Sequence, residues 1–341
     1  MRTIYWKDGT VVTIDQSLLP QRLVYLRLRG CKEVAKIIKE MKVRGAPLIG
    51  VAAAFGLALT AYHSRERSRE GSIKELDASA ELLRSTRPTA VNLFWAIDRV
   101  LGKAHATKGS AAEVSNAVVE EAIKMAEEDV EMNKAIGRNG AELLEDGDTV
   151  LTHCNAGSLA TVGYGTALGV VRAAVEDGKK ISVIATETRP KQQGARLTTF
   201  ELKHDGIPVT LICDTMVGYV MQKGLVDKVL VGADRILKTG HVINKIGTYQ
   251  IAVLAKVHNI PFYSAAPTST FDLKKDVKDV VIEERSQDEV LKIFRNRIAA
   301  VGVEALNPAF DITPPEYVSL VICEKGCIEP KEIAKAFRRP R

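Results

Sequence analysis

The stretch EDGDTVLTHCNAGS, residues 145–158, marks the point where the sequence changes its pattern. Before it, apolar residues recur at helical spacing. After the turn cluster Glu145–Asp148 comes the short, β-rich run Thr149–Thr152. We therefore predict a domain boundary here, with one domain over residues 1–145 and a second over residues 146–341.

Short apolar runs alternate with helix-like segments throughout the second half, at a spacing of roughly 20 to 30 residues. Such alternation is typical of a parallel sheet whose strands are joined by crossover helices. The sequence thus predicts an α/β, Rossmann-like C-terminal domain. Its expected strands are residues 149–152, 181–185, 209–212, 228–231 and 261–264, with a last one at 318–323.

The first half is predominantly helical after a β-hairpin. Residues 4–6 and 10–14 flank Lys7-Asp8-Gly9, and Asp-Gly between β-forming residues is a strong hairpin signal. Pro47 and Pro88 each stand at the first turn of an expected helix, and the helical spacing is longest over Ser110–Leu144. A further helix is indicated by apolar residues at i, i+3, i+4 and i+7, namely Val34, Ile37, Ile38 and Met41.

Composition places the chain among ordinary globular proteins and excludes disorder, collagen and coiled coil. Its 341 residues are 46% hydrophobic and 26% charged, and the net charge of +6 is spread along the chain. A mildly basic balance is compatible with a small anionic substrate and does not indicate nucleic acid. Two uncharged stretches, Gly45–Tyr62 and Asn155–Val171, are rich in Ala and Gly, so we expect buried helices rather than membrane spans.

Cysteine usage favours a reducing, cytoplasmic location. The N-terminus contains Lys7 and Asp8 before any apolar core of a signal peptide. Six scattered histidines and the absence of CxxC or HExxH motifs argue against a metal site. The cysteines are odd in number and far apart: Cys31, Cys154, Cys213, Cys323 and Cys327.

Polar side chains follow nearly every expected strand, and the carboxyl ends of parallel strands form the ligand crevice of such sheets. Cys154 is the first candidate, since it stands in a Gly/Ser-rich turn ahead of a helix whose amides favour a thiolate; the alternative is a buried small apolar residue. Asp234 and Asp214 are candidate acids, or alternatively caps of a turn and of a helix. The other residues after strands are His153 and Asn155, residues 186–189, Cys213, Thr215, Arg235 and residues 265–268.

Three basic residues stand beside expected helix starts, where unpaired amides bind anions. Arg44 precedes Gly45-Ala46-Pro47, Arg87 precedes Pro88, and Asn244-Lys245 precedes the helix expected from Thr248. Gly45 would let its backbone approach a phosphate closely while Arg44 holds the phosphate oxygens. The alternative is ordinary solvated side chains, but recurrence in both halves predicts a phosphate site between them.

One glycine cluster imitates a dinucleotide-binding motif. Gly163, Gly165 and Gly169 run GxGxxxG rather than GxGxxG, about ten residues after the strand end. We therefore expect close helix packing at these glycines and no NAD cofactor.

These segments closely resemble the methylthioribose-1-phosphate isomerase family, nearly end to end. This family shares a superfamily with ribose-1,5-bisphosphate isomerases and the regulatory subunits of translation initiation factor two B. The run THCNAGSLAT and the NK pair within GHVINKIGT are the most specific to the isomerases. The matching segments are RGAPLIG (44–50), STRPTAVNL (85–93), THCNAGSLATVGYGTALG (152–169), ETRPKQQGARLT (187–198) and VGADRILKTGHVINKIGTYQIA (231–252).

The resemblance implies that Cys154 and Asp234 are the catalytic pair. It further implies a cofactor-independent homodimer acting on a phosphorylated pentose, with neither nucleic acid nor membrane as a partner. Two relatives stay open as alternatives, a ribose-1,5-bisphosphate isomerase and a non-catalytic regulatory subunit. The implied substrate-binding residues are Arg44, Gly45, Ala46, Arg87, Gln193, Asn244 and Lys245.

Overall fold

The computed structural model describes residues 1–87 and 90–337. The chain forms two compact units: unit 1 comprises Met1–Lys134 and Gly157–Gly165, and unit 2 comprises Ala135–Ala156 and the chain from Thr166 onward. A helical N-terminal part with a β-hairpin and a parallel-sheet C-terminal part confirm the predicted fold class. The domain boundary at residues 145 and 146 stays a prediction.

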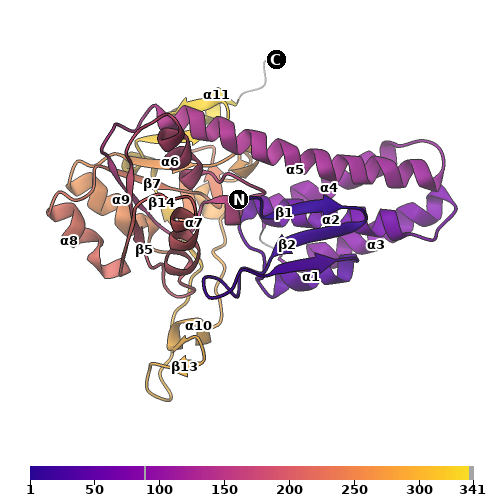
Figure 1. Ribbon diagram of the computed structural model, residues 1–341, viewed down its shortest axis with the longest axis horizontal. Coiled ribbons are helices and arrows are strands. Elements are labelled where there is room, and N and C mark those ends of the chain that lie inside the picture. The colour runs from indigo at the N-terminus through magenta and orange to yellow at the C-terminus, as the bar shows by residue number, and fades with distance from the viewer. Residues whose placement is uncertain (88–89, 338–341) are drawn as a thin grey trace. The chain divides into compact units, whose positions relative to one another are not determined.

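Unit 1 begins with a three-stranded antiparallel sheet. β1 (Ile4–Lys7) and β2 (Thr10–Ile14) form the predicted hairpin, and β3 (Tyr25–Leu28), which the sequence did not predict, pairs with β2. Figure 1 shows α5 as one long, continuous helix. The helices are α1 (Cys31–Lys39), α2 (Ala46–His63), α3 (Arg69–Arg84), α4 (Val91–Ala106) and α5 (Ala111–Ala141); Pro88, expected to open α4, lies outside the described residues.

The core of unit 1 is built around α2, whose Ala and Gly residues let neighbouring helices approach. An added Cβ at Gly56 would lie 3.2 Å from Leu83 of α3, and one at Gly50 only 2.9 Å from the carbonyl oxygen of Asn92 in α4. α2 is long and apolar enough to cross a membrane by length and composition, but 72% of it is buried inside the protein. It is therefore the buried helix expected for Gly45–Tyr62.

The second uncharged stretch, Asn155–Val171, is not a buried helix throughout, so that prediction was wrong. It contains a single 3-10 turn, Ser158–Ala160, and only then the start of α6 (Ala167–Glu176). Gly165 has a φ of 87°, and an added Cβ there would lie 2.5 Å from the backbone of Gly157. Gly165 thus lets the chain pair closely with Gly157 in an antiparallel bridge. Among Gly163, Gly165 and Gly169 only Gly169 lies in a helix, so the helix packing expected at these glycines was wrong for the first two.

The segment Gly157–Gly165, called the 157–165 loop below, is bound to the rest of unit 1 by hydrogen bonds to its backbone. The Thr3 hydroxyl donates to the carbonyl oxygen of Ser158 at 2.6 Å, and the Gln16 amide donates to that of Leu159 at 2.7 Å. Because all four residues are buried, these bonds supply partners to groups that water does not reach.

A buried carboxyl group, Asp129 of α5, holds the same loop. Its Oδ2 atom accepts the backbone N–H of Val162 at 2.7 Å and the Asn133 amide at 3.0 Å. Burial raises the pKa of Asp129 to about 7, because the charged form loses its hydration.

The raised pKa of Asp129 predicts an unusual pH dependence of stability. Between pH 4 and pH 7 the folded protein keeps a proton that the unfolded chain releases, so this group's contribution to the free energy of unfolding falls as pH rises through that window. In urea titrations, the free energy of unfolding of wild type should fall by up to about 1.4 kcal/mol per pH unit relative to that of the Asp129→Asn variant. The exposed Glu120→Gln change on the same helix is the control, and parallel profiles for wild type and Asp129→Asn would contradict the assignment.

Unit 2 contains a seven-stranded sheet of order β16-β15-β10-β7-β4-β5-β6, in which only β16 runs antiparallel. Three strands match the prediction, namely β4 (Thr149–Thr152), β6 (Val209–Ile212) and β7 (Lys228–Val231), and three are shifted or shorter. The latter are β5 (Ser182–Thr186), β10 (Phe262–Ala265) and β15 (Leu320–Cys323); β16 (Gly326–Ile328) was not predicted. The helices are α6, α7 (Thr199–His204), α8 (Val217–Gln222), α9 (Thr248–Val257) and α11 (Ile333–Ala336).

A second, four-stranded sheet was missed by the sequence analysis. Its strands, in the order β11-β8-β9-β14, are Phe271–Asp272, Arg235–Leu237, Val242–Lys245 and Phe310–Thr313. A small arm also projects from unit 2 in Figure 1, made of α10 (Asp288–Leu291), β12 (Lys292–Ile293) and β13 (Asn296–Arg297).

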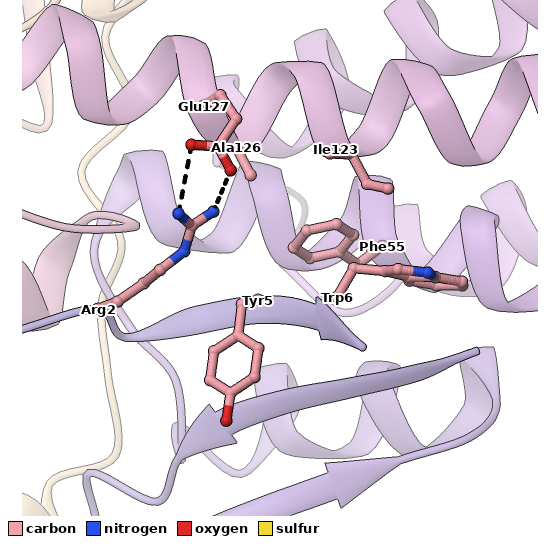
Figure 2. Close-up of a pocket in the computed structure, with 7 residues that line it drawn as sticks. All are labelled: Arg2, Tyr5, Trp6, Phe55, Ile123, Ala126 and Glu127. Atoms are coloured by element: carbon pink, nitrogen blue, oxygen red, sulfur yellow. Dashed lines mark hydrogen bonds and ion pairs between the residues drawn. The ribbon is translucent and has the colours of Figure 1, made fainter. Parts of the chain in front are cut away.

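A pocket in unit 1 is lined by residues of the N-terminal segment, α2 and α5. Figure 2 shows its lining, in which the Arg2 guanidinium forms an ion pair with Glu127 of α5 beside the Trp6 and Phe55 rings. Arg2 and Glu127 are both substantially exposed, and an exposed ion pair contributes little to stability. The pocket is therefore a feature of the surface between the hairpin and α5, and none of the predicted site residues lines it.

Candidate functional site

The strand order of the large sheet reverses between β4 and β7, two parallel neighbours. From β4 the chain proceeds to β5 and β6 on one side, and from β7 to β10 and β15 on the other. At such a reversal the connections leave in opposite directions, and a crevice opens beyond the carboxyl ends of the two strands. Cys154 follows β4 and Asp234 follows β7, so both candidate residues stand where this topology places ligands.

The chain segments beyond these two strands also contact each other. An added Cβ at Gly232 would lie 2.7 Å from the Cβ atom of Ala156. Asp234 donates its N–H to the carbonyl oxygen of Ile243, and the pairing of Arg235 with Ile243 places Asp234 beside Asn244. Asp234 therefore directly precedes β8 of the second sheet.

Cys154 is buried, with 9% of its surface exposed, and has a φ of 63°, which is uncommon for a residue other than glycine. Its backbone is held by two threonine side chains. The N–H donates to Thr188 Oγ1 at 2.8 Å, and the Thr198 hydroxyl donates to its carbonyl oxygen at 2.6 Å. The helix expected after the Gly/Ser-rich turn is only a 3-10 turn, Ser158–Ala160, and the next α-helix, α6, begins at Ala167. Residues other than glycine that adopt such strained conformations are found most often at functional sites.

His153, which the sequence analysis noted only as a residue after a strand, is buried next to Cys154. Its Nε2 atom lies 2.8 Å from the carbonyl oxygen of Ile246 and its Nδ1 atom 2.6 Å from Thr186 Oγ1. Burial lowers the pKa of His153, so the imidazole is neutral at pH 7. The position of a polar His after a buried strand was the signal available in the sequence.

Asp214 does not cap the helix that follows it, so that interpretation was wrong. Its two carboxylate oxygens accept the backbone N–H groups of Thr188 and Arg189, at 2.8 and 2.7 Å. Asp214 therefore holds the loop after β5, in which Thr188 also has a positive φ of 63°.

Asn244 and Lys245 lie just before α9, which begins at Thr248 as predicted, after Gly247, whose φ is 103°. They also end strand β9, which the sequence did not predict. The Lys245 ammonium group donates to the carbonyl oxygen of Ala309 at 2.8 Å and lies 4.5 Å from the centre of the Phe310 ring. The buried Asn244 amide donates to the Thr248 hydroxyl at 3.0 Å.

The first turn of α9 already has an acidic partner, Asp311. Its Oδ2 atom accepts the N–H groups of Gly247 and Tyr249, at 2.7 and 3.1 Å. Burial raises the pKa of Asp311 to about 6. The turn that carries Asn244 and Lys245 is thus fixed from both β9 and β14.

Gln193 is 95% buried, since only 5% of its surface is exposed, and its Oε1 atom has no hydrogen-bond partner among the described residues. Buried polar atoms are almost always paired in folded proteins, so an orphaned one at a candidate site is consistent with a ligand partner. Gln193 directly precedes a π-helical turn, Gly194–Thr198, a feature that often marks functional sites.

The four remaining candidates lie in unit 1. Arg44 is 8% exposed, so the alternative of a solvated side chain is wrong for it. Gly45 precedes α2 with a φ of 96°, and an added Cβ there would lie 2.4 Å from the carbonyl oxygen of Ala160 in the 157–165 loop. Ala46 begins α2, with Pro47 in its first turn as predicted, and Arg87 lies shortly before α4. Gly50 of α2 lies close to Asn92 of α4, so α2 and α4 pack together near their N-terminal ends.

The described residues contain no group of three or more His, Cys, Asp or Glu side chains suited to a metal ion. All five cysteines are thiols. Burial raises the pKa of Cys31 and of Cys323 to about 11, so these two stay protonated.

Gly194 is a residue whose replacement should disturb this site. An added Cβ would lie 1.8 Å from the carbonyl oxygen of Thr186, so the backbone must shift. Gly194→Ala should lower the free energy of unfolding by about 1 to 3 kcal/mol in a denaturant titration.

Gly218→Ala on α8 is the matched control, because its added Cβ would meet only Leu254 side-chain atoms at 3.8 Å. This change should be neutral or slightly stabilising, since alanine favours helix. Equal stability of the two variants would show that the Gly194 turn adapts freely.

Comparisons with known proteins identify the family of the chain. Residues 42–330 match the Initiation factor 2 subunit family. The methylthioribose-1-phosphate isomerase of Carboxydothermus hydrogenoformans is 53% identical over 343 residues, covering 99% of both chains.

Two solved structures are similar over nearly the whole chain. The crystal structure of 5-methylthioribose 1-phosphate isomerase from Pyrococcus horikoshii OT3 has a TM-score of 0.93 and 46% identity, covering 98% of this chain and 94% of that one. The crystal structure of translation initiation factor eIF-2B, subunit delta, from A. fulgidus has a TM-score of 0.90 and 53% identity, with 98% and 99% covered. The chain therefore belongs to the Initiation factor 2 subunit family and, within it, to the methylthioribose-1-phosphate isomerase family that its sequence resembles.

Proposed function

We propose that this protein is an aldose–ketose isomerase that converts 5-methylthioribose 1-phosphate to the corresponding ketose 1-phosphate in methionine salvage. The observation that carries the proposal is the placement of Cys154 and Asp234 at the ends of β4 and β7, where the strand order reverses. The names of near full-length relatives supply the substrate. A cytoplasmic homodimer without a cofactor belongs to the same proposal.

The substrate explains why an acid and a thiol are needed. A sugar with phosphate on its anomeric oxygen cannot open to a free aldehyde as other aldoses do. In this proposal, Asp234 protonates the ring oxygen while the bond from that oxygen to the first carbon breaks. The hydrogen on the second carbon then moves to the first, either as a proton carried by Cys154 through an enediol phosphate or as a hydride. As the ketone forms at the second carbon, the 2-hydroxyl group gives its proton back to the Asp234 carboxylate, which restores the acid. Both routes benefit from exclusion of water, and the burial of Cys154 supports this role.

Phosphate binding is assigned to groups of two kinds. Arg44 and Lys245 supply positive charge, and Gly45 and Ala46 supply amides at the start of α2. Gln193, whose Oε1 atom is buried and unpaired among the described residues, would pair with a sugar hydroxyl. Arg87 and Asn244 complete the binding set in this proposal.

A second candidate function is that of a regulatory initiation-factor subunit, favoured by the name of the similar A. fulgidus structure. Such a subunit has no chemical need for a thiol and a carboxyl group at adjacent strand ends. The presence of both Cys154 and Asp234 therefore favours the isomerase.

Conversion of purified sugar phosphates tests the proposal. We expect turnover of 5-methylthioribose 1-phosphate and a strong preference for it over ribose 1,5-bisphosphate, because burying an uncompensated second phosphate costs far more than burying a methylthio group. Cys154→Ser and Asp234→Asn should each lower kcat at least ~100-fold while the protein stays folded.

The outcomes of this experiment separate the alternatives. A higher kcat/KM for the bisphosphate would assign the chain to that neighbouring activity. Absence of turnover with all three sugar phosphates, the third being ribose 1-phosphate, would favour the regulatory subunit. Near-normal turnover by a folded Cys154→Ser or Asp234→Asn variant would remove that residue from the catalytic pair.

Lys245→Met and Arg44→Met should weaken substrate binding by about 1.5 to 3 kcal/mol, the range for losing a charge-assisted bond to phosphate. The effect should be measured as a higher dissociation constant in calorimetry with the Cys154→Ser protein, which binds without turnover. Lys256→Met, an exposed position on α9, is the control. Unchanged affinity in Lys245→Met or Arg44→Met would take that residue out of the phosphate site.

A further inference from the structure

We infer that His153 is a positioning residue for the proposed reaction, because it joins the backbone of Cys154 to the turn that carries Asn244 and Lys245. The inference rests on the proposed function for its kinetic consequences only. The connection itself consists of hydrogen bonds within unit 2 that run from the buried Cys154 to the half-buried Ile246.

The connection is a chain of four hydrogen bonds. The N–H of Cys154 lies 2.8 Å from Thr188 Oγ1, which lies 3.2 Å from Thr186 Oγ1. Thr186 Oγ1 lies 2.6 Å from His153 Nδ1, and His153 Nε2 lies 2.8 Å from the carbonyl oxygen of Ile246.

The direction of every bond follows from the two ends. The backbone N–H of Cys154 can only donate, and the Ile246 carbonyl can only accept. His153 must therefore carry its proton on Nε2, so Nδ1 accepts the Thr186 hydroxyl proton. Since Thr186 Oγ1 gives its own proton to His153, it can only accept from the Thr188 hydroxyl, whose proton lies between this oxygen at 3.2 Å and the Thr186 carbonyl oxygen at 3.3 Å. Hydrogen bonds aligned head to tail reinforce one another, so each bond depends on the others.

Packing leaves His153 little freedom to move. Its side chain is 2% exposed, and an added Cβ at Gly247 would lie 3.1 Å from its ring. The charged groups near the ring are Asp214, which raises the pKa of His153, and Lys245, which lowers it. Both effects are weaker than that of burial. Thr186 and Thr188 are themselves fully buried. Water therefore cannot replace a lost partner, and a change at one end is felt at the other.

Two substitutions divide the two roles of the imidazole. In His153→Gln, the side-chain amide nitrogen can replace Nε2 toward Ile246, but the acceptor for Thr186 is lost. In His153→Asn, an acceptor near Nδ1 is kept, but the contact with Ile246 is lost. We expect kcat to fall about tenfold in His153→Gln with little change in KM, and KM to rise about tenfold in His153→Asn with a smaller change in kcat.

A double-mutant cycle tests whether His153 acts through Thr186. Thr186→Val removes only the hydroxyl group and should reproduce the fall in kcat of His153→Gln, and the double variant should be no slower than either single one. His241→Gln is the matched control, because His241 also bonds a threonine, Thr239, but in the turn between β8 and β9. That control should leave both constants unchanged.

A readout without substrate separates this inference from the proposed function. Alkylation of Cys154 by iodoacetamide, followed by peptide mass spectrometry with the exposed Cys213 as internal reference, should be at least about threefold faster in His153→Gln and Thr186→Val. If wild type fails to isomerise the sugar phosphate but alkylation changes as expected, only the function is overturned. Two results would overturn the positioning role. One is an unchanged alkylation rate of Cys154 in folded His153→Gln and Thr186→Val. The other is the same change in kcat and the same change in KM for His153→Gln and His153→Asn.

Discussion

The candidate site depends on one topological constraint, the reversal of strand order between β4 and β7. Parallel strands need long crossover connections, and at the reversal these connections leave toward opposite edges of the sheet. Side chains that follow the two strand ends can therefore contact a ligand. Asp234 lies there because β7 is followed by the start of a second sheet, in which β8 pairs with β9. That pairing also carries Asn244 and Lys245 to the same edge.

Side chains, rather than a regular ladder, stabilise the backbone at this edge. Cys154 and Thr188 both have a positive φ, so their peptide groups cannot continue the parallel pairing. Instead, threonine hydroxyls accept the N–H of Cys154 and donate to its carbonyl oxygen, and the Asp214 carboxylate accepts the N–H of Thr188. A conformation that costs on the order of 1 to 3 kcal/mol per residue persists because these fixed partners leave the chain no better alternative.

The features that could be predicted from sequence are those set by local pattern, and the others depend on long-range pairing. β4 and β7 are short runs dominated by β-branched residues and leucine, so they match their predicted ranges, and the residue types that follow them already indicate Cys154 and Asp234 as candidates. Their roles in catalysis stay predictions. In contrast, β8, β9, β11 and β14 have two to four residues each and mix polar with apolar side chains, so no periodicity reveals them. The position of Lys245 just before α9 could therefore be predicted, but not that it ends a strand. The role of Asp214 was missed for a similar reason, because its partners are 25 and 26 residues away in sequence.

The 157–165 loop also sets the order in which the protein can fold during synthesis. The ribosome releases the N-terminal hairpin and the five helices before this loop exists as chain. Until residue 165 emerges, the side chains of Thr3, Gln16 and Asp129 lack the partners that this loop supplies. Unit 1 is thus an incomplete nascent domain that must wait for part of its own core, and a chain cut after residue 145 would expose these unsatisfied groups to chaperones and proteases.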